Sequence, residues 1–159
     1  MTFIIYVTRV LFVALVITYM FQVVACSRQT EDKMIVFEHK AESYYDDASY
    51  VSFLEAVANG DKQRIADLIS KGVNVDAEGN HGMRPLSWAI GKQSVEGYHF
   101  LLENGANMNA VSQNQKGQNV SPMLLASVSS NPEYLKLALG YGGDPNMSSG
   151  YGGRTIVYE

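Results

Sequence analysis

The middle of the chain alternates between short apolar blocks with helical spacing and polar breaks that contain glycine. The first apolar block spans residues 53–57 and is followed by the polar break NGD at residues 59–61. Three aliphatic side chains between residues 65 and 69 then fall on one helical face. A lysine and Gly72 come next, which are the residues that helix C-termini favour. The pattern predicts a helix–turn–helix pair that begins near residue 48.

This pattern recurs with a period near 33 residues. The phrase GVNVDA at residues 72–77 returns as GANMNA at residues 105–110, and a looser copy, GGDPN, occupies residues 142–146. A period of this length, with a glycine that closes a helix and a polar turn after it, is the signature of stacked helical repeats. A single unit cannot bury its own apolar face, so the units must stack into a scaffold that presents a surface. We therefore expect binding rather than catalysis.

The second unit carries the clearest family signature. It reads GMRPLSWAI at residues 82–90, continues with an apolar stretch at residues 95–103, and closes with an Asn-Gly pair. This resembles the ankyrin repeat, whose common form is Gly-x-Thr-Pro-Leu-His-x-Ala-Ala, a turn, a second helix and Gly-Ala-Asp-x-Asn. Pro85 lies in the first helical turn, where proline is favoured. Arg84 and Ser87 replace the Thr and His of the family, so we expect part of the hydrogen bonding at the helix turn to be lost.

The resemblance covers residues 50–159 and implies an all-α ankyrin repeat solenoid of about three repeats, with helix–turn–helix pairs and short hairpin fingers. The step from Pro85 to Pro122 is longer than the step from Gly72 to Gly105 by four positions, while the spacing from proline to closing glycine is the same in both units. The extra positions must therefore lie in the connecting finger, residues 111–119, and loop elaboration of this kind is where repeat proteins often place binding determinants. The start of a fourth unit, GGRT at residues 152–155, stops at Glu159. We expect the sequence to be part of a longer chain, with an irregular cap as the alternative.

Residues 1–25 have the character of an export signal. The only charged side chain among them is Arg9, and residues 10–24 are nearly all apolar. The junction VVAC resembles the bacterial lipoprotein signal box, which implies that Cys26, the only cysteine, becomes the acylated first residue. The alternative is a retained membrane anchor, although residues 10–25 are fewer than the roughly 20 that span a bilayer. Both place the domain outside the cytoplasm, and Ser27 resembles the residue of lipoproteins sent to the outer membrane.

Without residues 1–25, the chain is acidic. Removing Arg9 from the 12 basic residues leaves 11 against 16 acidic ones, a formal charge of −5. No two Lys or Arg residues are adjacent, so there is no electrostatic footprint for nucleic acid. An acidic surface is better suited to a basic protein partner. We assign residues 26–47 to an acidic linker, in which the apolar residues 34–37 and the pair Tyr44-Tyr45 can dock as a cap, and residues 48–159 to the repeat domain.

The sequence contains no catalytic set. His39, His81 and His99 have no histidine or cysteine partner at metal-ligand spacing, and the Gly-rich residues 148–153 lack the Lys-Ser/Thr of a phosphate loop. The paired carboxylates lie in segments expected to be exposed, where desolvation cannot raise their pKa for acid–base work. We expect no enzyme activity, cofactor, metal ion or small-molecule substrate.

The resemblance to ankyrin repeats also implies where a partner binds. In that family the fingers and the exposed side of each first helix form a concave groove, and counting in register places Glu55, Trp88, Leu125 and Glu159 toward it. Trp88 is the only tryptophan, and an exposed aromatic at the centre of such a groove suits a binding anchor. The alternative is that Trp88 packs against its neighbours in the core. The finger residues that complete the candidate surface are Asp76, Glu78, Asn80, His81, Gln113, Asn114 and Gln115.

The second unit also resembles a narrower group. The strings GMRPLSWAIGKQ at residues 82–93 and FLLENG at residues 100–105 are similar to those of exported Gram-negative ankyrin lipoproteins, some of which are thought to be immunity proteins against lipase effectors of the type VI secretion system. The resemblance implies a periplasmic, lipid-anchored protein that binds and occludes a toxin. The alternative is a structural or assembly adaptor of the cell envelope. A host-directed effector fits poorly, because acylation at Cys26 would retain the protein in the bacterium.

Overall fold

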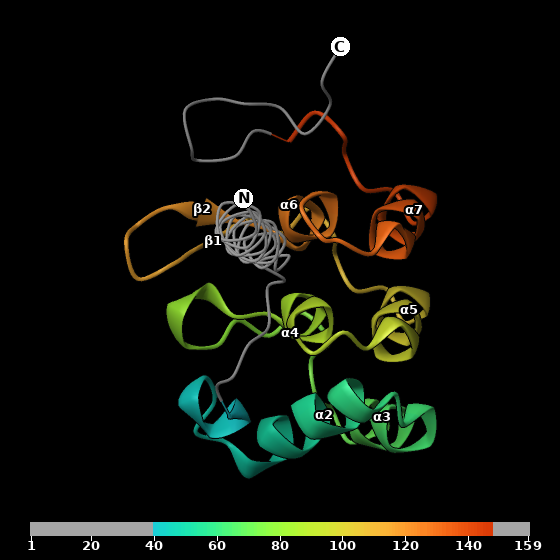
Figure 1. The fold of residues 1–159 in the computed structure, drawn as a ribbon. Coiled ribbons are helices and arrows are strands. Elements are labelled where there is room, and N and C mark those ends of the chain that lie inside the picture. The colour runs from blue at the N-terminus through green and yellow to red at the C-terminus, as the bar shows by residue number, and fades with distance from the viewer. Residues whose placement is uncertain (1–39, 148–159) are drawn as a thin grey trace, which may run out of the picture. The chain divides into compact units, whose positions relative to one another are not determined.

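The computed structural model describes residues 40–147, all of which belong to one compact unit. Three helical hairpins stack in this unit (Figure 1). The expected export signal, Cys26 and the start of a fourth unit at residues 152–155 lie outside the described residues.

Each hairpin contributes one helix to each of two layers (Figure 1). The first layer contains α2 (Ala48–Asn59), α4 (Pro85–Gly91) and α6 (Pro122–Ser127). The second layer contains α3 (Lys62–Ser70), α5 (Val95–Glu103) and α7 (Pro132–Gly140). The short 3-10 helices η2 (Ala41–Ser43) and η3 (Asn80–Gly82) and the strands β1 (Ser112–Gln113) and β2 (Asn119–Val120) make up the rest of the regular structure.

Local sequence signals fix where these helices begin and end. Side chains of Asp61, Ser94 and Ser121 cap α3, α5 and α6 by accepting a hydrogen bond from a backbone N–H of the first turn. Prolines stand in the first turn of α4, α6 and α7, where no N–H is needed. The repeat-closing glycines Gly72 and Gly105 have φ of +96° and +82°, the left-handed conformation that ends a helix.

Burial between the layers stabilises helices that are too short to persist alone. The helices α4 and α6 have 7 and 6 residues, well below the roughly 12–15 at which an isolated helix becomes marginally stable. Every residue of α4 is buried. Gly97 lets α5 approach α2, because a Cβ at this position would lie 2.1 Å from the carbonyl oxygen of Val57. Tyr98 and Tyr134 continue the core into the third hairpin as an edge-to-face pair, with ring centroids 5.0 Å apart.

Side chains of Asn and Asp join the hairpins along the loops that follow α3, α5 and α7. Asp76 Oδ1 accepts a hydrogen bond from the N–H of Asn107 at 2.8 Å, and Asn109 Oδ1 accepts one from the N–H of Asp144 at 2.8 Å. Within each loop an Asn or Asp also accepts from the N–H two residues further on. We call this the Asn/Asp ladder; its members are Asn74, Asp76, Asn107, Asn109, Asp144 and Asn146.

The folded unit includes residues that precede the first hairpin. Tyr44 and Tyr45 are 8% and 7% exposed and belong to the core, so this pair docks on the repeats as the sequence allowed. The hydroxyl of Tyr45 lies 2.7 and 2.9 Å from the carbonyl oxygens of Ala77 and Met83 and can donate its one proton to either, and its ring stacks on Tyr50. Burial raises the pKa of the Tyr45 hydroxyl, which favours the protonated donor. Residues assigned to the linker thus close the first finger.

Candidate functional site

The groove that the sequence predicts should be lined by the first helix layer and the fingers. Glu55 is exposed on α2, and Leu125 is partly buried on α6. Glu159 lies outside the described residues. The structure therefore leaves Glu55 free to contact a partner and gives Leu125 mainly a packing position.

The expectation that Trp88 is exposed in the groove is wrong. The Trp88 side chain is 2% exposed, and its Nε1 donates to the carbonyl of Leu54 at 2.9 Å. Tyr44 packs edge-on against the indole at 5.9 Å, and the Lys92 ammonium lies 4.6 Å from the ring centroid. The alternative, that Trp88 packs against its neighbours, is the one observed. Trp88 is buried because residues 41–45 dock against it, and the helical period of the sequence does not predict this docking. Trp88 is therefore not part of the candidate surface.

Arg84 organises the first finger, a role that sequence reasoning missed. Its Nε donates to Ser112 Oγ at 2.8 Å, its Nη1 to the carbonyl of Asp76 at 2.6 Å, and its Nη2 to Glu78 Oε2 at 2.6 Å. The guanidinium supplies several donors in a fixed fork, so one side chain can hold three acceptors together. The substitution of Thr by Arg therefore replaces hydrogen bonding at this turn instead of losing it.

Two predicted finger residues consequently have structural partners. Asp76 belongs to the Asn/Asp ladder through Asn107. Glu78 pairs with Arg84, although its side chain remains 44% exposed. These contacts explain the two carboxylates without a partner protein, and only Glu78 keeps enough exposed surface to contact one.

The tip of the first finger is exposed. Asn80 and His81 are both exposed, and His81 adopts φ of +63°, a left-handed conformation unusual for a residue with a side chain. The N–H of Asn80 donates to the carbonyl of Tyr44 at 2.8 Å, and the His81 ring lies edge-on to Tyr44 at 6.4 Å. The docked segment thus fixes the position of this tip.

The second finger is an antiparallel hairpin of β1 and β2, in which Gln113 pairs with Asn119. Asn114 Oδ1 accepts from the N–H groups of Lys116 and Gln118 at 2.9 and 3.0 Å, so this side chain builds the turn. Gln113 and Gln115 remain exposed. The insertion predicted between residues 111 and 119 is therefore a self-closed hairpin with exposed amide side chains.

Together these exposed positions define what we call the finger surface: Glu78, Asn80, His81, Gln113 and Gln115. The two fingers contact each other, because a Cβ at Gly82 would lie 2.7 Å from the carbonyl oxygen of Gln113. The surface is thus polar, continuous across two repeats and held in place by Arg84 and Tyr44. Such an arrangement can make hydrogen bonds to a partner without large ordering of its own backbone.

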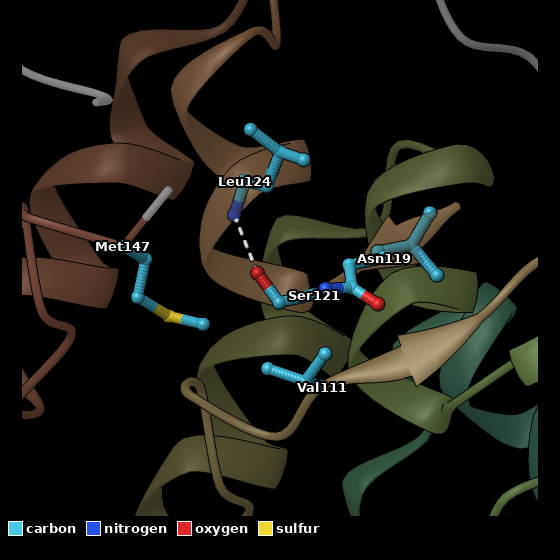
Figure 2. A pocket seen from close by; sticks show the side chains of 6 residues that line it. Val111, Asn119, Ser121, Leu124 and Met147 are labelled. Carbon is cyan, nitrogen blue, oxygen red and sulfur yellow. Dashed lines mark hydrogen bonds between the residues drawn. The ribbon is translucent and has the colours of Figure 1, made fainter. Parts of the chain in front are cut away.

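A pocket of about 210 Å³ lies beside the second finger, at the start of α6 (Figure 2). Ser121 at its edge accepts a hydrogen bond from the N–H of Leu124 at 3.1 Å. The other lining residues are mostly apolar: Val111, Asn119, Val120 and Met147. None of the predicted partner-binding residues within residues 40–147 lines this pocket.

Within residues 40–147 no group of three or more His, Cys, Asp or Glu side chains could hold a metal ion. Over the same described stretch, no helix has the length and apolar character needed to cross a bilayer.

Stacked helical hairpins, closing glycines, paired fingers and the Asn/Asp ladder define an ankyrin repeat solenoid, as the sequence predicted. Among solved structures, the chain is similar to the human ASB11 ankyrin repeat domain, with a TM-score of 0.53 and 28% identity over 65% of this chain and 44% of that one. The fold is that of a protein–protein interaction module.

Sequence comparisons agree with this fold. The chain is 36% identical over 56 residues to the ankyrin repeat, SAM and basic leucine zipper domain-containing protein 1 of Mus musculus. The aligned residues cover 35% of this chain and 12% of that protein. It is 29% identical over 99 residues to the protein of the same name from Carollia perspicillata, covering 60% of this chain and 20% of that protein. No family model matches the chain. The chain thus spans a fifth or less of the length of these relatives.

Proposed function

We propose that this chain is a membrane-tethered periplasmic protein-binding module that binds and occludes a secreted antibacterial effector of the lipase type, and so protects the producing cell. The observation that carries the binding role is the finger surface, which is polar, exposed and fixed in place by structural hydrogen bonds. The lipobox-like junction at Cys26 supports the tether and the compartment. The resemblance of residues 82–93 and 100–105 to exported ankyrin lipoproteins supports the kind of partner.

The chemistry of the surface suggests how the partner is held. Exposed amides at Gln113 and Gln115 and the imidazole of His81 offer both donors and acceptors to a polar patch. The formal charge of −5 without residues 1–25 would speed association with a basic partner at low salt. Because the fingers are already ordered, little conformational entropy is lost on binding. Occlusion then requires only that the bound fingers cover the entrance to the effector's active site.

Co-purification with the product of an adjacent effector gene tests the partner. We expect Gln113→Ala combined with Gln115→Ala to weaken this binding by roughly tenfold or more, since both substitutions lie on the finger surface. Gln63→Ala is the matched control, because Gln63 is exposed on α3 in the other helical layer. Equal binding by the finger variant and the control would argue against this surface. Retrieval of an endogenous envelope protein in place of an effector would favour the adaptor function instead.

The tether is tested separately. We expect wild-type protein to incorporate labelled palmitate and to fractionate with membranes, and Cys26→Ala to abolish the label. Wild-type protein that carries no label and fractionates with the cytosol would contradict the proposed location, whatever the binding result.

A further inference from the structure

The two ends of the described stack differ in polarity. At the first end, Arg64 of α3 is exposed and its Nη2 donates to Ser52 Oγ at 2.6 Å. Alignment of the helix caps Asp61, Ser94 and Asn131 places Gly97 and Tyr134 at the positions equivalent to Arg64. Both of those residues are buried against the preceding hairpin. At this position the first repeat exposes a polar side chain, whereas the internal repeats bury theirs, as expected of a terminal cap.

The opposite end is apolar. Tyr98 and Leu102 of α5 are 0% and 4% exposed, and the same alignment places Leu135 and Leu139 of α7 at the equivalent positions. Leu139 is 45% exposed, and Val128, just after α6, is 60% exposed. The third hairpin thus presents the kind of face that the second hairpin buries. A further unit stacked on it would cover these side chains.

The pocket at the start of α6 belongs to this third, last described hairpin, where Ser121, Leu124 and Met147 are among the residues that line it (Figure 2). In register, Ser121 occupies the position of Arg84, while Val111 corresponds to Glu78. Arg84 spans the space between its finger and Ser112 of the next unit. The side chain of Ser121 is too short to span the corresponding space in the third repeat, so this space remains open as the pocket. Its volume of about 210 Å³ exceeds that of a cavity of ~150 Å³ that accepts benzene, so a branched aliphatic side chain fits.

We propose that residues 153–158 (GRTIVY) dock on the third hairpin over this pocket and seat Ile156 in it. One repeat period separates Ile156 from Pro122, so Ile156 repeats the position of Pro85 and Pro122, two of the most completely buried side chains in the described stack. Val157 then repeats Leu86 and Met123, which are 1% and 0% exposed.

The connecting chain is long enough for this placement. Met147 corresponds to Ala77, and Thr155 corresponds to Arg84. The step from Met147 to Thr155 is one position longer than the step from Ala77 to Arg84. Thr155 is also a favoured N-cap residue, at the position where Ser121 caps α6. The segment therefore has the reach, the cap and the apolar residues that the face requires, independently of any partner.

A photo-cross-linking amino acid at position 156 of the full chain tests the docking directly. Benzophenone reacts with C–H bonds that it touches, and we expect adducts within the same chain on Met147 or on the peptide that spans residues 119–124. The same reagent at Tyr151, a position equivalent to the exposed finger tip, is the control and should give no adduct in the pocket. Adducts between copies that increase with protein concentration would show that a second copy occupies the pocket, and would overturn the proposal. Adducts elsewhere in the chain would do so as well.

Hydrogen exchange gives an independent readout on the full chain. We expect Ile156→Asp to speed exchange of the α6 amides by about tenfold, because losing the docked segment lowers the cost of local opening. Tyr151→Asp, the same kind of change a few residues earlier, should leave these rates unchanged. Exchange in α6 that is identical in wild type, Ile156→Asp and Tyr151→Asp would refute the docking.

Discussion

Replacing Trp88 with alanine tests whether this side chain supports the fold or contacts a partner. The indole is 2% exposed, its N–H is bonded to the carbonyl of Leu54, and it packs under Tyr44. Removing such a side chain costs about 3–5 kcal/mol, from lost burial and from the cavity left behind. That is a large part of the ~5–15 kcal/mol that stabilises a typical domain. We expect Trp88→Ala to lower the urea midpoint by roughly 2 M, at a typical slope of ~2 kcal/mol per molar.

The assay is urea unfolding followed by far-ultraviolet circular dichroism, since the substitution removes the only tryptophan fluorophore. Tyr141→Ala is the control: the residue is 44% exposed and contacts the side chain of His99, so a loss of only about 1 kcal/mol is expected. Trp88→Phe should fall between the two, because it keeps most of the apolar area but leaves the Leu54 carbonyl without its donor. A Trp88→Ala protein of wild-type stability that has lost partner binding would refute our account and restore Trp88 as a surface anchor.

Three further substitutions test the packing. Gly97→Ala should destabilise the domain by about 1–3 kcal/mol, because the added methyl group meets a carbonyl of α2. At Gly140 in α7 an added methyl group meets no atom of the described residues within 4 Å, so Gly140→Ala should stabilise the domain by up to about 1 kcal/mol. Thermal unfolding of the two variants checks this difference in sign. Asp76→Ala should lower the free energy of unfolding by about 1 kcal/mol, because it breaks the Asn/Asp ladder. Asp76→Asn should lower it much less, because Asn109 accepts the equivalent hydrogen bond one repeat later. Equal losses of stability for the two variants in urea unfolding would contradict the ladder. The Tyr134 hydroxyl is buried without a hydrogen-bond partner among residues 40–147, so Tyr134→Phe should not lower the melting temperature. Burial raises the pKa of Tyr134 to about 12 from 10.0, so the stability it contributes is complete below pH 10 and is lost as the pH rises toward 12; pH titration of unfolding should show a smaller alkaline loss in the Phe variant.

The repeat architecture could be predicted because its signals are local and periodic. Closing glycines, N-cap side chains and prolines act within one turn of a helix, and their recurrence once per repeat marks each unit. The four-residue insertion was also placed correctly, since the spacing from proline to glycine is constant on either side of it. These features need no knowledge of which residues meet in space.

The contacts that the sequence did not reveal join residues far apart in the chain. Tyr44 covers Trp88 and Arg84 reaches Ser112, each across more than half a repeat. No period connects such pairs, and the docking of Tyr44 lies outside the repeat altogether. Asp76 is a further example: its sequence position predicts an exposed carboxylate, whereas in the structure it accepts a hydrogen bond from Asn107 of the next repeat. A repeat motif predicts in which direction a side chain points. It does not predict which distant residues pack against that side chain, so the exposure of a polar residue is the feature that the motif predicts least well.

The self-closed hairpin of β1 and β2 has an evolutionary consequence. Its turn is closed by hydrogen bonds within the hairpin, two of them to Asn114 Oδ1, and lengthening a loop of about six residues by four costs only ~0.5 kcal/mol of closure entropy. Substitutions at Gln113 or Gln115 would then change the exposed side chains of this finger while leaving the helical stack untouched. A chain with this fold can therefore vary its exposed finger residues while its helical scaffold stays the same.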